Sequence, residues 1–276
     1  MEKALSRQPD SKGLGYKINT DGKTCEITGI GTCTDETVAI PEDIDGCMVT
    51  GIGADAFRDC LGFKNITIPR SIKSIGERAF CGCAQLSALI IPDSVIYIAE
   101  CAFPGVGEVK ISEDNPNYMS SNNAVFTKDM KTLLHCASNI KGHFFDVPSS
   151  VTRIGNGAFH ACHNLTGIRL GNSVTEIGEN AFWSCKNLEE INLGNSVVII
   201  GRSAFKACIK LQSIVLPVSL AIIEKNAFLF CNSLSSVRYN GTRLQWKHVR
   251  LEDAKWRYDS AIRTLVCVDG TIEYPF

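Results

Sequence analysis

Apolar residues recur along most of the chain with a period of 23 residues. Phenylalanines that each follow an alanine mark this period, and they are Phe57, Phe80, Phe103, Phe159, Phe182, Phe205 and Phe228. A full unit reads Ile-Gly-x-x-Ala-Phe-x-x-Cys-x-x-Leu-x-x-Ile-x-Leu, as in residues 177–193. A unit this short cannot bury its own apolar face, so it must stack on its neighbours. The period therefore predicts a solenoid, in which one elongated core runs through all units.

The end of each unit alternates apolar and polar positions, as expected for a strand with one buried face. We expect nine such strands, paired in parallel along one side of the solenoid. Their last apolar residues are Ile40, Ile68, Ile91, Ile111, Val147, Leu170, Leu193, Leu216 and Tyr239. After most strands a Pro or Gly, followed by a Ser, should turn the chain out of the sheet. The Ala-Phe segments are short, and we expect them to form the opposite wall as short helices or 3₁₀ turns.

One coil contains extra residues. Ile111 and Val147 lie 36 residues apart, which is 13 more than the period of 23. Within this stretch, two runs that read as strands flank a turn at 128–131. We predict a β-hairpin at 123–137, inside an insertion of about 112–146, that protrudes from the regular solenoid.

Both ends of a solenoid need a cap over the exposed core. At the start, residues 16–19 and 25–28 should form a hairpin around the turn at Asp21-Gly22. After the last repeat, apolar bulk is supplied by Trp246, Val249, Trp256, Tyr258 and Ile262. The alternative interpretation is that these residues form an aromatic ligand-binding site. We favour capping, because the core of the last coil has to be covered.

These features predict the domain organisation. We expect a flexible segment at 1–15 and a single solenoid domain at 16–276. Within that domain the N-cap is 16–51, the repeats are 52–239 and the C-cap is 240–276.

Charge and hydropathy narrow the classes of partner. The chain has 28 Lys and Arg against 29 Asp and Glu, a net charge of -1, so charge favours neither nucleic acid nor an anionic membrane as partner. The apolar runs are far shorter than the roughly 20 residues that a membrane span needs. The segment before Tyr16 lacks the apolar stretch of a secretory signal. We therefore expect either an intracellular protein or one whose signal has been removed.

Cysteine is common, at 13 residues. Six cysteines occupy one repeat position, and they are Cys60, Cys83, Cys162, Cys185, Cys208 and Cys231. Free cysteine packs as a small hydrophobe. Equivalent atoms of adjacent coils lie about 4.7–4.9 Å apart, which does not by itself create disulfide geometry. We expect a buried ladder of unpaired thiols.

Catalytic and metal-binding patterns are weak. The closest approaches to metal-ligand clusters are at 81–83 and 160–163, but Cys83 and Cys162 belong to the ladder and no second Cys/His pair has a suitable spacing. The serines are turn residues, and the histidines share no repeat position, so no nucleophile has an evident base. We expect no catalytic residues, no metal and no cofactor.

The repeat resembles the BspA-like class of leucine-rich repeat proteins, the 23-residue type of bacterial and some protist surface proteins. The resemblance spans nearly the whole chain. Besides the repeats, it includes residues 46–53 before the first Ala-Phe unit, residues 115–118 ahead of the predicted hairpin and residues 239–246 at the end of the last repeat. It implies a right-handed α/β leucine-rich-repeat solenoid with terminal caps. It also implies adhesion or host-protein binding at the cell surface, with secretion as an alternative and a cytoplasmic location if Met1 is the native start.

The outward residues of the strands are the candidate binding surface. On each strand the residue between the last two buried positions, and the residue two places earlier, should point to solvent. The candidates are Ile90, Phe144, Arg169, Glu190, Asn192, Val215 and Arg238. Their mixture of charge, polarity and apolar groups suits a protein or glycan partner. The alternative is that they are ordinary solvated strand residues, because bulk composition does not distinguish an interface.

The sequence thus predicts a non-enzymatic binding module that uses its sheet face. Two alternatives stay open: a structural spacer or assembly element of a surface protein, and an intracellular protein-interaction scaffold. We expect no nucleic acid partner and no membrane insertion.

Overall fold

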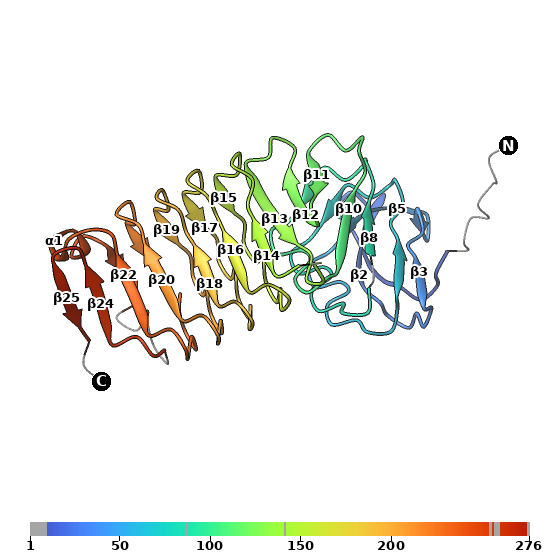
Figure 1. The fold of residues 1–276 in the computed structure, drawn as a ribbon. Helices are drawn as coiled ribbons and strands as arrows, with labels where there is room; N and C mark the ends of the chain where they lie inside the picture. The colour runs from blue at the N-terminus through green and yellow to red at the C-terminus, as the bar shows by residue number, and fades with distance from the viewer. Residues whose placement is uncertain (1–9, 87, 141, 254–255, 257–259, 275–276) are drawn as a thin grey trace. The chain divides into compact units, whose positions relative to one another are not determined.

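The structure is a computed structural model that describes residues 10–86, 88–140, 142–253, 256 and 260–274. The chain is a parallel β-solenoid, in which short strands of one coil pair with the equivalent strands of the next (Figure 1). It divides into two compact units, Met1–Met119 and Ser120–Phe276. The assignment of 16–276 to one domain stays a prediction.

The first unit has two sets of strands. One sheet has the order β1 (Gly15–Ile18), β2 (Thr24–Gly29), β5 (Cys47–Ile52), β7 (Ser74–Ile75) and β9 (Tyr97–Ile98), with β4 (Asp43–Ile44) paired to β5. The other strands pair as β3 (Thr37–Ala39) with β6 (Asn65–Thr67) and β8 (Ala88–Ile91) with β10 (Glu108–Ile111). The predicted hairpin around Asp21 is confirmed, because β1 and β2 pair in antiparallel fashion.

The chain just before β1 packs on the first coil. The amide of Ser11 donates to the carbonyl oxygen of Ala39 at 2.9 Å, and Leu14 is buried. Of the segment predicted to be flexible, residues 1–9 lie outside the described part of the chain. Ala39, predicted to point to solvent, is buried because the Ser11 segment covers it.

The second unit, described by itself, has two walls of short strands. One wall has the order β11 (Tyr118–Ser121), β12 (Ala124–Thr127), β13 (Thr132–Cys136), β15 (Arg153–Ile154), β17 (Glu176–Ile177), β19 (Ile199–Ile200), β21 (Ile222–Ile223) and β23 (Arg250–Leu251). The other wall has β14 (Phe144–Asp146), β16 (Gly167–Arg169) and β18 (Glu190–Asn192), then β20 (Ser213–Leu216), β22 (Ser236–Tyr239), β24 (Thr264–Cys267) and β25 (Gly270–Glu273). All nine predicted strands are present. The prediction did not include the two-residue strands β15, β17, β19, β21 and β23 of the first wall. It also missed β24 and β25, because their sequence does not repeat.

The Ala-Phe segments form turns, where short helices or 3₁₀ segments were expected. In one of them the amides of Trp183 and Cys185 each donate to the carbonyl oxygen three residues earlier, at 3.0 and 3.1 Å. The amide of Phe182 donates to Ala204 of the next coil at 2.7 Å. Positive φ angles at Asn180 (56°) and Ser184 (61°) interrupt a right-handed helix. The backbone is therefore satisfied between coils, and among the described residues only α1 (Arg243–Trp246) is helical.

Stacked phenylalanine rings fill the core of the second unit. Neighbouring rings from Phe159 to Phe228 lie 5.0 to 5.2 Å apart with interplanar angles of 15° or less. Trp256 closes the stack with its ring edge against Phe228, at 5.7 Å. Trp246, Val249 and Ile262 are also buried, which confirms capping for these residues. Tyr258 lies outside the described residues.

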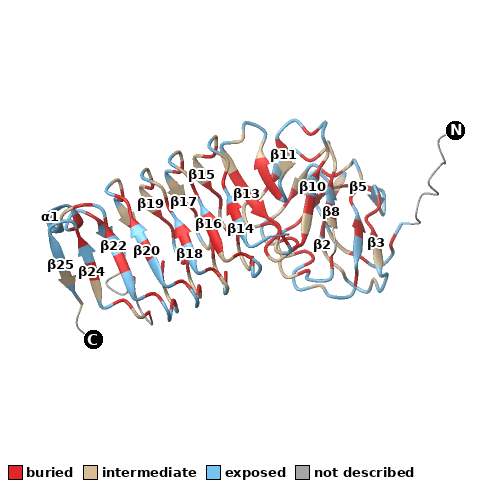
Figure 2. Ribbon diagram, in the orientation of Figure 1, coloured by how far each residue is buried: buried red, intermediate tan, exposed pale blue. Residues whose placement is uncertain are grey.

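The hairpin at 123–137 forms, but the prediction that it protrudes is wrong. β12 and β13 pair in antiparallel fashion, and Val125, Phe126 and Leu133 have no exposed surface. Figure 2 shows much of β13 coloured as buried. β13 also pairs in parallel with β15, which places Leu133 opposite Ile154. β13 therefore occupies the position of a repeat strand, and the hairpin is part of the core of the second unit.

The cysteine ladder is confirmed at five of its six positions. Cys83, Cys162, Cys185, Cys208 and Cys231 are buried, and all thirteen cysteines are free. The prediction is wrong for Cys60, which is partly exposed. Each buried thiol donates to a carbonyl of the preceding coil; the Sγ of Cys208 lies 3.1 Å from the oxygen of Phe182. This contact explains a thiol at the position, because it adds a hydrogen bond to an otherwise apolar packing site.

Candidate binding surface

The outward residues of the second unit form two lines across the sheet. One line, here called the Phe144 line, consists of Phe144, Gly167, Glu190, Ser213 and Ser236. The other, the Arg169 line, consists of Asp146, Arg169, Asn192, Val215, Arg238 and Val266. All of these residues except Gly167 are exposed. The strand alternation thus places them as the sequence predicts.

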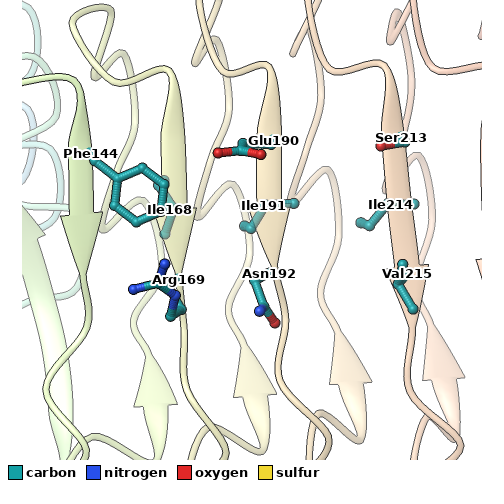
Figure 3. Close-up of a pocket in the computed structure, with 9 residues that line it drawn as sticks. All are labelled: Phe144, Ile168, Arg169, Glu190, Ile191, Asn192, Ser213, Ile214 and Val215. Carbon is teal, nitrogen blue, oxygen red and sulfur yellow. The ribbon is translucent and has the colours of Figure 1, made fainter.

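A shallow hollow lies between the two lines (Figure 3). Its volume is about 240 Å³. The lining residues are Phe144, Ile168, Arg169, Glu190, Ile191, Asn192, Ser213, Ile214 and Val215. They come from four successive strands, β14, β16, β18 and β20. Five of the seven sequence-predicted residues therefore meet in one place, although their role in binding stays a prediction.

Phe144 reaches across to the neighbouring strand. A Cβ atom at Gly167 would lie 2.4 Å from two carbons of the Phe144 ring, so only glycine leaves room for the ring there. The guanidinium carbon of Arg169 lies 5.1 Å from the ring centroid, within the range of a cation–π contact. The ring is held in place although 42% of Phe144 is exposed.

Asp146 pairs with the arginine of the hollow. The Nη1 of Arg169 donates to Oδ1 of Asp146 at 2.7 Å. Both side chains are more than half exposed, so the pair orients the guanidinium more than it stabilises the fold. Asp146 and Gly167 were predicted to face outward, but no sequence signal marked their contacts with Arg169 and Phe144. Such contacts depend on side-chain length across strands, which a repeat pattern does not encode.

Two predicted site residues lie outside the hollow. Arg238 is on the same face, in register with Val215 and one strand further along. Ile90 belongs to the first unit, where it is 62% exposed and in register with Lys110 on the next strand. The hollow therefore does not include Ile90.

An aromatic cluster lies on the Ala-Phe turns of the second unit. His160 stacks on Trp183 with ring centroids 4.8 Å apart and an interplanar angle of 4°, and Lys206 Nζ lies 5.0 Å from the Trp183 centroid. Burial, with a smaller contribution from His163, lowers the pKa of His160 to about 4. His160 is therefore neutral at physiological pH, which suits ring stacking.

Metal binding and membrane-spanning helices have little support in the described part of the chain. Within the described ranges, no three or more His, Cys, Asp or Glu side chains are grouped as metal ligands. That includes the 160–163 stretch, where the Cys162 thiol faces the core and donates to Cys136. Nor does any part of the chain that the structure describes form a helix with the length and hydropathy of a membrane crossing.

Comparison with known proteins identifies the repeat. A family model described as a BspA type leucine rich repeat region matches residues 50–141 and 132–247, in six copies. No curated protein sequence matches the chain.

Solved structures with the same fold come from bacteria. A leucine rich cell surface protein from Faecalibacterium prausnitzii A2-165 is 20% identical, with a TM-score of 0.55 over 90% of this chain and 99% of that one. The pneumococcal vaccine antigen PcpA is 17% identical, with a TM-score of 0.61 over 94% and 83% of the two chains. A leucine-rich repeat protein from Eubacterium ventriosum ATCC 27560 is 19% identical, with a TM-score of 0.51 over 96% and 95%. At these identities the similarity shows the fold alone.

Proposed function

The chain belongs to the BspA-type leucine-rich repeat family, and we propose that it is a non-enzymatic module that binds a macromolecule through the outward sheet face of its second unit. The partner is a protein or a glycan. The site of action is the cell surface, where binding serves adhesion or attachment to host molecules. Two similar structures are described as a cell surface protein and a vaccine antigen, which supports this location.

The hollow between the Phe144 line and the Arg169 line carries the proposal. It gathers an exposed aromatic ring, a guanidinium, a carboxylate and a carboxamide from three successive strands, β14, β16 and β18. Strand residues held by inter-coil hydrogen bonds are rigid, so little conformational entropy is lost when a partner orders them. Arginine is among the residue types enriched where binding energy concentrates, and Arg169 and Arg238 both lie on this face.

The proposal is tested by comparing two double variants against arrays of matrix proteins and glycans. Arg169→Ala with Arg238→Ala removes two positive charges from the sheet face. Arg202→Ala with Lys225→Ala removes the same charge from two exposed residues away from that face. We expect the sheet-face variant to bind its array partner with an affinity lowered by more than about 1 kcal/mol, because truncating a binding-energy hot spot has at least that effect.

The control variant should keep full affinity, and the melting temperatures of both should match the unaltered protein. Equal loss in the two variants would indicate a general charge effect and not a binding face. Absence of any partner would favour the structural spacer instead.

A further inference from the structure

We propose that the hollow lined by Phe144, Arg169, Glu190 and Asn192 binds one sugar ring of a neutral glycan. The inference rests on the proposed function of the sheet face and names the ligand class for it.

The size of the hollow fits a single ring. Its volume of about 240 Å³ lies below the roughly 300–1,000 Å³ of pockets for drug-sized ligands. The hollow is also open on the sheet surface, with Ser236 and Arg238 following on the next strand. A chain of sugars can therefore continue along the face while one unit occupies the hollow.

The Phe144 ring is the apolar platform of the site. Figure 3 shows the ring reaching from β14 toward β16, with its face toward the viewer. The face of an aromatic ring carries partial negative charge, and the C–H groups on one side of a pyranose are apolar and weakly positive. Gly167 provides the space beneath the ring, and Arg169 contacts it at 5.1 Å. The platform is thus pre-organised, which lowers the entropic cost of binding.

The polar groups around the ring match hydroxyl groups. Arg169 only donates hydrogen bonds, ionised Glu190 only accepts them, and Asn192 does both. The Oδ1 of Asn192 accepts from the amide of Gly194 at 2.9 Å, which fixes the orientation of its carboxamide. Each sugar hydroxyl is both donor and acceptor, so this mixed set can satisfy several hydroxyls at once.

The charges favour a neutral ligand. Arg169 is already paired with Asp146 at 2.7 Å, and Glu190 adds a further negative charge on the next strand. The carboxylates of Asp146 and Glu190 repel an acidic glycan or another polyanion, and the guanidinium of Arg169 repels a basic peptide. The exposed apolar groups of the hollow are limited to Phe144 and Val215. A protein–protein interface has a larger apolar core than these two side chains can form.

The test is an NMR titration of the full chain with the methyl glycosides of glucose, galactose, mannose and N-acetylglucosamine, and with their neutral oligosaccharides. We expect saturation transfer to the C–H protons of at least one sugar, and amide shift changes at Arg169, Glu190 and Asn192. Phe144→Ala should weaken this binding at least 10-fold. Phe230→Ala removes a ring of nearly the same exposure, 43% against 42%, and should leave sugar binding unchanged.

Gly167→Ala is the second variant, because it displaces the ring without removing it. We expect weaker sugar binding at an unchanged melting temperature, since the exposed end of Phe144 can move away from the new methyl group. Sugar binding that survives both Phe144→Ala and Gly167→Ala would overturn the site.

The outcomes separate this inference from the proposed function. One outcome is that no sugar binds, but a protein partner binds the unaltered chain and loses affinity when Arg169 and Arg238 are substituted. In that case the glycan assignment is wrong, and the sheet face is still a binding surface. If neither class binds, both are wrong.

Discussion

The ring of Phe144 occupies the space above Gly167, where the Cβ of any larger residue would lie 2.4 Å from the ring carbons. Glycine within a strand often marks a close approach of another group, and here the group is a side chain from the adjacent strand. The aromatic platform is therefore made by two residues 23 positions apart, one present for its ring and the other for its lack of a side chain.

The stacked core predicts a large loss of stability on removal of one ring. Phe182 is fully buried between Phe159 and Phe205. Phe182→Ala should lower the free energy of unfolding by roughly 3–5 kcal/mol, because burial is lost and a cavity remains. Urea denaturation measures this change. The control is Phe230→Ala, which should have a small effect because Phe230 is 43% exposed. A loss below about 0.5 kcal/mol, typical of surface positions, would contradict the assignment of Phe182 to the core.

The thiol ladder predicts selective labelling. Burial raises the pKa of Cys83 and of Cys231 to about 12, and buried Cys208 is shifted in the same direction. Since the thiolate is the reactive form, these thiols should resist iodoacetamide in the native protein and react fully after unfolding. Among the six ladder cysteines, partly exposed Cys60 should be labelled first. Mass spectrometry of timed samples checks the order, and a disulfide between any two ladder cysteines would refute it.

The hairpin predicts that its removal unfolds the second unit. Replacement of 123–137 by a short Gly-Ser link deletes Phe126 and Leu133 from the core and the partner strand of β15. Circular dichroism should show a lost or broadened cooperative melt. The matched control inserts two glycines between Lys128 and Asp129, both exposed at the turn, where an insertion should be tolerated. A normal melt after the deletion would restore the prediction of a protruding hairpin.

His160 predicts a loss of stability in mild acid. Its folded pKa, about 4 because of burial and nearby His163, lies below the value of about 6.5 expected in the unfolded chain. The unfolded state therefore binds more protons between these values, so the free energy of unfolding falls as pH drops from about 6.5 toward 4. The contribution reaches at most about 3.4 kcal/mol, at 1.36 kcal/mol per pKa unit.

Urea denaturation at pH 7.5 and 4.5 measures the effect. The variant His160→Gln should show a smaller difference between the two pH values than the unaltered protein. An equal difference in both proteins would assign the acid sensitivity to other groups.

The sequence predicted the coil well because each repeat position has one structural role. In the units from Phe159 to Phe228, the Ala-Phe pair, the ladder cysteine and the alternating strand end fill the same space each time, as the stack of Phe159, Phe182 and Phe205 shows. Prediction failed at the Ala-Phe segments, which form turns and not short helices, and where residues depart from the period. β13 enters the core without carrying the motif, and the Ser11 segment covers Ala39 from outside the repeats.

The candidate site was predictable only in part. Strand alternation identified which side chains point outward, and five of them meet in the hollow. Alternation does not specify how far a side chain reaches, so it does not predict the contacts of Phe144 with Gly167 and of Arg169 with Asp146.

Hydroxyl-radical footprinting tests the central claim, that the sheet face of the second unit binds the partner. The protein is oxidised with and without its array partner, and the modification rates of Phe144 and Phe230 are compared by mass spectrometry. The two rings are 42% and 43% exposed in the free protein, so each serves as the reference for the other. We predict that the partner slows oxidation of Phe144 several-fold and leaves Phe230 unchanged; protection of Phe230 with an unprotected Phe144 would contradict the account.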